Sequence, residues 1–166
     1  MRDLIRDAHA GTQATHPTLP NLLAAGSSRA QQRDPVVIPA PRVLLVEDDE
    51  TLALVIAYNL RAAGYNVEWI SRGDLVEAYL AVNAVDIVIL DWILPGRSGL
   101  DLCRWLRRHA LRDEIPIIMA TALGHEDDRA AGLTAGADDY IAKPFSMAAL
   151  IERVGLLLQG RSSANA

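Results

Sequence analysis

The sequence predicts a doubly wound α/β fold with a five-stranded parallel sheet. Short apolar runs, rich in β-branched residues and leucine, alternate five times with longer amphipathic segments over about 120 residues. The runs are apolar at successive positions, as strands are when a sheet is buried on both faces. Because right-handed crossovers connect parallel strands, we expect helices on both faces of the sheet.

The first strand and helix show the clearest pattern. The run RVLLVE at 42–47 predicts a buried strand. In the segment 50–64 that follows, Leu52, Ile56 and Leu60 recur at helical spacing, and Gly64 supplies a C-terminal stop. This pair is therefore expected to form the first strand–helix repeat.

The other elements follow in the same alternating order. Their strand runs are YNVEWI, VDIVIL, IPIIMA and DYIA, each followed by a segment with helical periodicity. We expect these strands at 65–70, 85–90, 115–120 and 139–142, and the helices at 73–82, 100–109, 128–136 and 146–159.

Composition and charge limit the classes of function. Hydrophobic residues make up 51% of the 166 residues, as in soluble globular proteins, and the net charge of -5 argues against a general affinity for nucleic acid. The single cysteine, Cys103, excludes an internal disulfide. No apolar run is long enough to cross a bilayer, and the N-terminus lacks the apolar region of a signal peptide. We therefore expect a cytoplasmic protein.

Three regions are expected along the chain. Residues 1–41 contain prolines, small residues and amides without a sustained period, and they predict a mostly disordered N-terminal extension. Residues 42–158 hold the folded domain. Residues 159–166 predict a C-terminal tail.

Polar side chains follow four of the five predicted strands. Glu47 and Asp48 follow the first strand, Asp91 the third, Thr121 the fourth and Lys143 the fifth. The carboxyl ends of parallel strands meet at one edge of a sheet, which is where ligands bind in open α/β folds. The sequence therefore predicts a functional site at this edge.

The residue types indicate phosphoryl chemistry with a hard metal ion. A cluster of carboxylates is tolerable if a divalent cation neutralises it, and oxygen ligands of this kind suit Mg²⁺. A carboxylate beside that ion can attack phosphorus and hold the phosphoryl group as an acyl phosphate. A lysine and a hydroxyl can bind the remaining phosphoryl oxygens.

The segments that carry these residues resemble a known family. VLLVEDDE, VDIVILDWILPGRSGLDLCRWLR and IPIIMATALGHEDDRAAGLTAGADDYIAKPF look like the receiver domain of bacterial two-component response regulators. The match is closest to the OmpR/PhoB type and covers residues 42–158. The resemblance implies a flavodoxin-like (βα)5 sheet with the strand order 2-1-3-4-5.

The resemblance also implies the roles of the acidic residues. Asp91 matches the aspartate that accepts a phosphoryl group from a histidine kinase or a histidine phosphotransfer protein. Glu47 and Asp48 match the acidic pair that holds Mg²⁺ together with Asp91. The remaining protein ligand of the metal, a backbone carbonyl two positions after the aspartate, falls on Ile93.

The same comparison implies a switch and a signalling face. Thr121 matches the hydroxyl that turns toward the phosphoryl group, Lys143 the lysine that pairs with it, and Tyr140 the aromatic residue that moves with the threonine. The bond between Lys143 and Pro144 matches one that is usually cis. The loop after the aspartate is matched at Pro95, Gly96 and Gly99.

The family's output face consists of the fourth helix, the fifth strand and the fifth helix. Arg129, Asp139 and Arg153 match charged residues of that face, through which OmpR/PhoB-type receivers dimerise. Ala149 stands where a glutamate usually pairs with the arginine of the fourth helix, so one bridge is missing and a homodimer is a weaker inference. The expected partners are a kinase or phosphotransfer protein and a downstream protein effector.

Several alternatives stay open. The chain has no basic recognition helix, so it should not bind DNA itself, but it is either a stand-alone receiver or the receiver fragment of an OmpR/PhoB-type transcription factor. A Mg²⁺-dependent aspartyl-phosphate hydrolase generally needs a second acid two residues after the nucleophile, where this chain has Ile93. A nucleotide-binding module would need a Gly-rich loop after the first strand, and the intact acidic, Thr and Lys set argues against an inactive scaffold.

Overall fold

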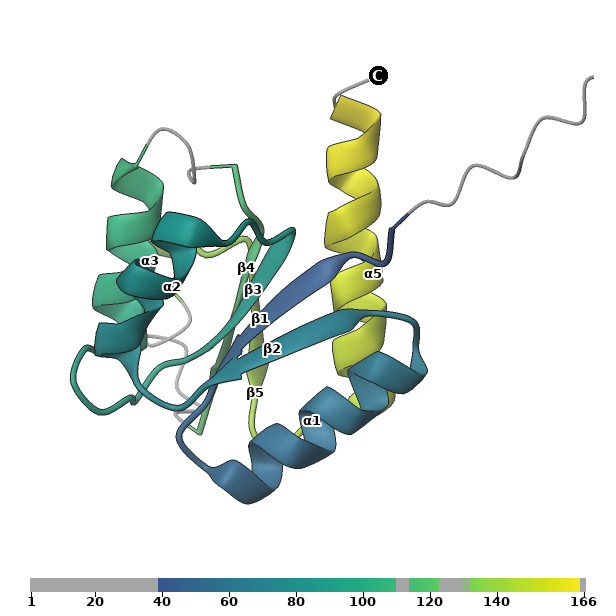
Figure 1. Cartoon of the computed structure of the whole chain (residues 1–166), viewed down its shortest axis with the longest axis horizontal. Helices are drawn as coiled ribbons and strands as arrows, with labels where there is room; N and C mark the ends of the chain where they lie inside the picture. Colours follow the sequence, from purple (N-terminus) through teal and green to yellow (C-terminus); the bar gives the residue numbers. More distant parts are fainter. Residues whose placement is uncertain (1–38, 110–113, 123–129, 131, 165–166) are drawn as a thin grey trace, which may run out of the picture. The chain divides into compact units, whose positions relative to one another are not determined.

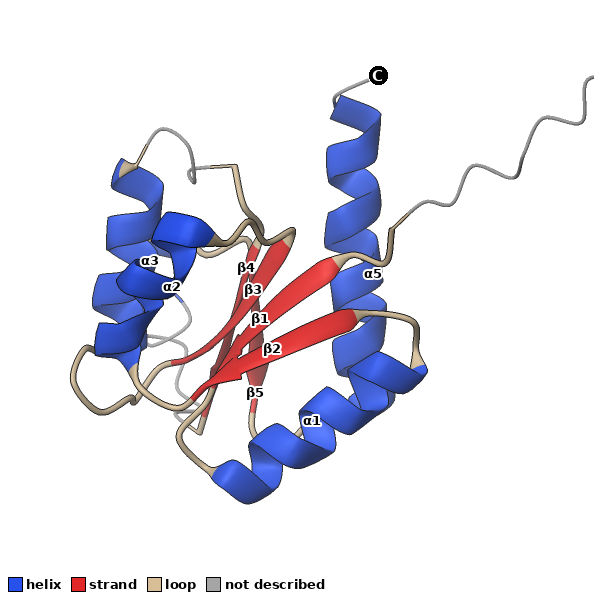
Figure 2. Ribbon diagram, viewed as in Figure 1, coloured by secondary structure: helices blue, strands red, loops and turns tan. Residues whose placement is uncertain are grey.

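The computed structural model describes residues 39–109, 114–122, 130 and 132–164. Its strands are β1 (Arg42–Val46), β2 (Asn66–Ile70), β3 (Ile87–Asp91), β4 (Ile117–Thr121) and β5 (Asp139–Ala142). Its helices are α1 (Glu50–Ala62), the 3-10 turn η1 (Gly73–Leu75), α2 (Val76–Val82), α3 (Gly99–Arg108) and α5 (Met147–Ala164). The strands form one parallel sheet in the order β2-β1-β3-β4-β5, which confirms the predicted fold class and strand order (Figures 1 and 2).

The two faces of the sheet bury separate apolar clusters. Alternate residues of β1 point to opposite faces, so Val43 and Leu45 belong to one cluster and Leu44 and Val46 to the other. The first cluster packs under α1 and α5, and the second under α2 and α3 (Figure 1). Burial on both faces explains why the strand runs are continuously apolar.

The predicted elements agree with the structure apart from their boundaries and one helix start. The segment 73–82, predicted as a single helix, begins as η1 and continues as α2. In the predicted helix 128–136, the described residues 130 and 132–134 are helical, and Arg129 lies outside the described residues. The N-terminal extension up to residue 38 also lies outside them.

The last helix extends beyond its predicted end at Gln159 into the segment 159–166, which was predicted as a C-terminal tail. Helix α5 continues through Gln159 and Gly160 to Ala164. Arg161 lies on this added segment, and its guanidinium donates a hydrogen bond to the backbone carbonyl of Asp86 at 3.0 Å. This contact with the start of β3 holds the end of the helix against the sheet.

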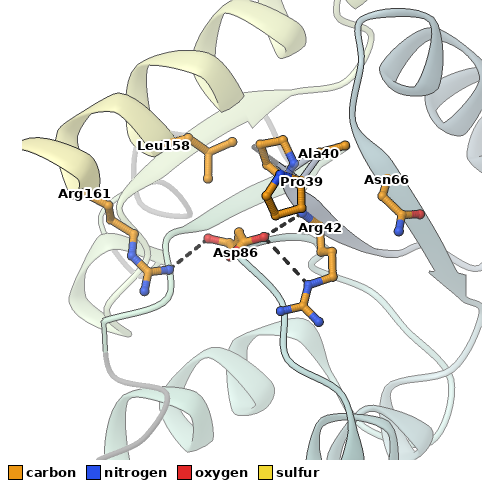
Figure 3. Close-up of a pocket in the computed structure, with 8 residues that line it drawn as sticks. Pro39, Ala40, Arg42, Asn66, Asp86, Leu158 and Arg161 are labelled. Carbon is orange, nitrogen blue, oxygen red and sulfur yellow. Dashed lines mark hydrogen bonds and ion pairs between the residues drawn. The ribbon is translucent and has the colours of Figure 1, made fainter. Parts of the chain in front are cut away.

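A groove of about 910 Å³ lies beside this contact, at the amino ends of the strands. Figure 3 shows Asp86 between Arg161 and Arg42, and Pro39 and Leu158 are also among the residues that line the groove. The Asp86 carboxylate accepts a hydrogen bond from the Arg42 amide at 2.7 Å, which ties the start of β1 to the start of β3. The groove therefore lies at the end of the sheet opposite to the predicted site.

Within the described part of the chain, no helix is both long enough and apolar enough to cross a membrane.

Candidate functional site at the carboxyl edge of the sheet

The sheet topology brings the predicted site residues together. Asp91 is the last residue of β3, which lies between β1 and β4. Thr121 ends β4 and pairs in register with Ala142 on β5, so Lys143 follows directly beside it. Glu47 follows β1. Four predicted residues from distant parts of the sequence therefore occur on one edge.

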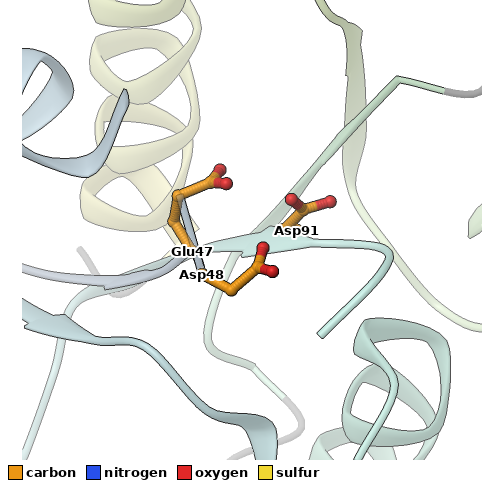
Figure 4. Close-up of side chains that lie close together, drawn as sticks. All are labelled: Glu47, Asp48 and Asp91. Carbon is orange, nitrogen blue, oxygen red and sulfur yellow. The ribbon is translucent and has the colours of Figure 1, made fainter. Parts of the chain in front are cut away.

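Three carboxylates form a compact cluster at this edge. Glu47, Asp48 and Asp91 each offer an oxygen, and these oxygens lie within 4.8 Å of one another (Figure 4). Only 1% of Glu47 and 7% of Asp91 is exposed, whereas Asp48 is exposed. The cluster thus combines two buried acids with one that faces solvent.

Lys143 connects the two buried acids. Its Nζ lies 2.6 Å from Glu47 Oε2 and 2.6 Å from Asp91 Oδ2. The backbone amide of Lys143 also donates to the carbonyl of Thr121 at 2.7 Å. The bond between Lys143 and Pro144 is cis, as predicted.

Burial and the neighbouring charged groups shift the pKa values of Glu47 and Lys143. Burial raises the pKa of Glu47 to about 7, the hydrogen bond from Lys143 opposes this change, and repulsion by Asp91 adds to it. Burial lowers the pKa of Lys143, but the hydrogen bonds to Asp91 and Glu47 outweigh it and the pKa is raised. The lysine is therefore a cation, and it is the main counter-charge that this cluster has among the described residues.

The donor set fits a hard divalent cation. All three side chains offer carboxylate oxygens, which Mg²⁺ prefers, and they converge from the ends of two neighbouring strands. A single ammonium cannot neutralise three carboxylates, so a cation would relieve the remaining repulsion. The acidic cluster can therefore hold a metal ion.

The loop after Asp91 is fixed at both ends. Near its start, the amide of Ile93 donates to Asp91 Oδ1 at 3.2 Å, while 60% of the Ile93 residue is exposed. At its end, the amide of Gly99 donates to the carbonyl of Trp92 at 2.9 Å. A Cβ at Gly99 would lie 1.9 Å from the Asp91 carbonyl oxygen, so this close approach requires glycine.

Gly96, the other predicted glycine of this loop, has a positive φ of 83°. Its Cα faces the carboxylate of Asp74, which lies beside the loop on η1. The glycines predicted in this loop thus have conformational and steric reasons to be there.

The residues predicted for the switch lie beside the cluster and on β5. Thr121 is fully buried at the end of β4. Tyr140 is partly buried and packs against the core under α2 and α3. Asp139, on β5, forms an ion pair with Arg153 of α5 within the same chain, with 2.7 Å between Arg153 Nη1 and Asp139 Oδ1.

Trp69 is not among the predicted site residues, yet it contacts the backbone of one of them. Its indole Nε1 donates to the backbone carbonyl of Glu47 at 2.8 Å. A tryptophan near the end of a strand looks like a packing residue, and nothing in the local sequence indicates this bond. Only the pairing of β1 with β2 reveals it.

Comparison with known proteins identifies the family. The response regulator receiver domain matches residues 43–155. The chain belongs to this family. It contains the receiver domain of a two-component response regulator, which is a signalling domain, and receivers of this kind interact with histidine kinases and effectors.

The relatives of this receiver include transcriptional regulators of the PhoB/OmpR type. The chain is 48% identical over 119 residues to the phosphate regulon transcriptional regulatory protein PhoB of Rhizobium meliloti, covering 72% of the chain and 52% of PhoB. It is 44% identical over 125 residues to the transcriptional regulatory protein BaeR of Escherichia coli, covering 75% of the chain and 51% of BaeR. The chain therefore spans about half the length of the curated relatives it matches.

Solved structures support the same assignment. A putative response regulator from Chloroflexus aurantiacus has a TM-score of 0.70 and 39% identity, covering 72% of this chain and 98% of that one. The BeF3-activated DrrB receiver domain has a TM-score of 0.65 and 29% identity, covering 72% of this chain and 98% of that one. Fold and family were both predicted correctly.

Proposed function

We propose that this receiver takes a phosphoryl group from a histidine kinase or a histidine phosphotransfer protein onto Asp91, with Mg²⁺. The observation that carries the proposal is the contact of Lys143 with both Asp91 and Glu47 inside the carboxylate cluster. An acid that is a nucleophile for phosphorus needs a cation beside it, because the phosphoryl group brings further negative charge. The cluster offers this cation and a set of metal ligands together.

The metal ligands in this proposal are Glu47, Asp48 and Asp91, together with the backbone carbonyl of Ile93. When bound, Mg²⁺ offsets the negative charge of the carboxylates and of the phosphoryl oxygens. The hydrogen bond that the Ile93 backbone amide donates to Asp91 Oδ1 supports this arrangement, because it holds the start of the loop next to the acid.

In the transfer step, a carboxylate oxygen of Asp91 attacks phosphorus. A P–O bond to Asp91 forms while the P–N bond to the donor histidine breaks, and the imidazole leaves with the electron pair of that bond. The Lys143 ammonium then binds a phosphoryl oxygen in place of the Asp91 carboxylate oxygen that it contacts in the unphosphorylated protein. The Thr121 hydroxyl binds another of the phosphoryl oxygens.

Output in this proposal follows from Thr121 and Tyr140. When Thr121 turns toward the phosphoryl group, Tyr140 follows and changes the face made by the fourth helix, β5 and α5, with Arg129, Asp139 and Arg153 as its charged residues. That face then regulates a protein partner, and a homodimer is a second use of it. The ion pair between Asp139 and Arg153 already exists within one chain, so a dimer would have to rearrange it.

A role within a transcription factor is the second candidate. Its support is that the matching relatives are transcriptional regulators whose other half this chain does not cover. In that setting the phosphoryl chemistry is the same, and DNA binding is not a property of the residues present here. We propose a cytoplasmic location in both cases.

The experiment that tests the proposal is labelling with radioactive acetyl phosphate. We expect Mg²⁺-dependent labelling of the full chain, its loss on adding EDTA, and its loss in Asp91→Asn. Asp101→Asn is the matched control, because Asp101 is an exposed acid in the first turn of α3 and is not a member of the carboxylate cluster. Labelling that persists in Asp91→Asn, or that needs no divalent cation, would overturn the proposal.

A further inference from the structure

The end of β2 holds the backbone of Glu47 from both sides. Trp69, the residue before the last in β2, donates from its indole to the Glu47 carbonyl at 2.8 Å. The carbonyl of Ile70, the last residue, accepts a hydrogen bond from the Glu47 amide at 3.1 Å. Both backbone polar groups of Glu47 are therefore hydrogen-bonded to β2. The amide bonds to a backbone carbonyl, and the carbonyl bonds to the side chain of Trp69.

The indole acts on the next residue through the peptide bond. The carbonyl of Glu47 lies in the same rigid plane as the amide nitrogen and Cα of Asp48. On the other side, Asp49 is the N-cap of α1, and its Oδ1 accepts a hydrogen bond from the Leu52 amide at 3.0 Å. Asp48 thus lies between two fixed points, and the Trp69 bond sets the plane from which its side chain leaves the backbone.

Asp48 is the member of the cluster with the least other support. Glu47 and Asp91 are buried and share the Lys143 ammonium. Asp48 is exposed and makes no hydrogen bond or ion pair through its side chain with any other residue that the structure describes. Its carboxylate is nevertheless within 4.8 Å of the other two acids. The direction in which the Asp48 carboxylate points therefore depends on the conformation of its backbone.

The ring of Trp69 is itself held in place. It is partly buried and packs against the apolar cluster under α1 and α5. A donor on a packed aromatic ring loses little conformational freedom when it binds, so its hydrogen bond fixes the carbonyl more firmly than a donor on a flexible side chain would.

We propose that Trp69 is a positioning residue for the metal site, and that its indole N–H orients the peptide between Glu47 and Asp48 so that the Asp48 carboxylate faces Asp91. This inference rests on the proposed function, since it assigns Trp69 a role in binding the cation that phosphorylation requires. It predicts that the N–H, rather than the bulk of the ring, sets the affinity for Mg²⁺.

The test compares three variants of the full chain. Trp69→Phe removes the donor and part of the ring, and replacement of Trp69 by benzothienylalanine removes only the donor and keeps the shape. Trp105→Phe is the control. It makes the same substitution at another of the three tryptophans, which lies on α3 and not on β2. The Mg²⁺ dissociation constant is measured by titration calorimetry at constant pH. Labelling by acetyl phosphate is measured at limiting and saturating Mg²⁺.

For both Trp69 replacements we expect Mg²⁺ to bind about threefold to tenfold more weakly, the range that one hydrogen bond allows. Labelling should fall at limiting Mg²⁺ and recover at saturating Mg²⁺, while the control behaves as the natural chain. An unchanged dissociation constant in the benzothienylalanine protein would overturn the inference, even if both replacements unfold more easily in EDTA. Failure of the proposed function is distinguishable, because then the natural chain would not label or Asp91→Asn would.

Discussion

Asp91 ends β3 and Lys143 directly follows β5, 52 positions later in the sequence, yet the ammonium of Lys143 lies 2.6 Å from Asp91 Oδ2. The same ammonium is equally close to Glu47. In the protein without metal, the lysine therefore offsets the charge of the acid that we propose as the phosphoryl acceptor. In the function proposed above, stability and phosphoryl chemistry therefore depend on the same contact.

Replacing Lys143 by methionine should destabilise the metal-free protein. The change keeps the length of the side chain and leaves two buried carboxylates without their cation, which costs about 3 kcal/mol in unfolding free energy at pH 7. Urea unfolding in EDTA measures this loss. Adding MgCl₂ should reduce it, because the metal replaces the missing positive charge.

The matched control for this change is Arg72→Met. Arg72 pairs with Asp74 at 2.8 Å, but both side chains are about half exposed. Such a surface pair contributes little to stability, because solvent screens it. Equal losses for the two variants would show that the burial of the Lys143 contact has no energetic consequence.

The contribution of Glu47 to the stability of the metal-free protein should fall as the pH rises from about 4.5 to about 7. The pKa of Glu47 is about 7 in the folded protein, against 4.5 for an ordinary glutamate. Between these values the folded protein keeps a proton that the unfolded chain has released, so rising pH favours unfolding, by roughly 2–3 kcal/mol in total.

Urea unfolding in EDTA at several pH values measures this dependence. Glu47→Gln is the comparison, because the amide does not titrate. We expect the natural chain to lose stability relative to the variant as the pH increases through this range. Parallel curves for the two proteins would contradict the raised pKa.

Ile93→Asn should shorten the lifetime of the phosphorylated state. Ile93 lies two positions after Asp91 and is largely exposed beside it, so an apolar side chain there shields the acyl phosphate from water. A barrier lower by 1 kcal/mol corresponds to phosphate loss about fivefold faster. Decay of radiolabel measures the rate, with Ile93→Val as control. Equal or slower loss in the asparagine variant would count against shielding.

Gly160→Ala should stabilise the protein. Gly160 lies inside α5, and a Cβ there would meet nothing within 4 Å. Alanine favours a helix over glycine by about 0.5–1 kcal/mol. Thermal unfolding shows whether the variant is more stable.

Gly64→Ala should have the opposite effect. A Cβ at Gly64 would also meet nothing within 4 Å, but the φ of Gly64 is 95°, so we expect alanine to destabilise the protein there.

Much of the fold and most of the site could be predicted because they depend on local patterns. Apolar runs mark the strands, and the residue after each strand is bound to reach the same edge of a parallel sheet. The sequence alone therefore predicts that Glu47, Asp91, Thr121 and Lys143 lie together at one edge of the sheet. The strand order came from the family resemblance.

The features that escaped prediction depend on contacts between distant segments. A glycine followed by arginine and two serines suggests that a helix has ended, but α5 continues to Ala164, and Arg161 on this segment donates a hydrogen bond to Asp86, 75 positions away. The bond from Trp69 to Glu47 spans 22 positions and requires the register of β1 with β2. The ion pair of Asp139 with Arg153 within one chain was not predicted, and it joins β5 to α5.

The anchoring of the loop between Trp92 and Gly99 has a consequence for how such a protein can diverge. Its two ends are bonded to each other, and Gly99 touches the backbone of Asp91. Substitutions between these anchors therefore change the side chains that lie between Asp91 and solvent, while the position of Asp91 is kept. The duration of a signal can be adjusted there, by selection or by design, while the ability to receive it is kept.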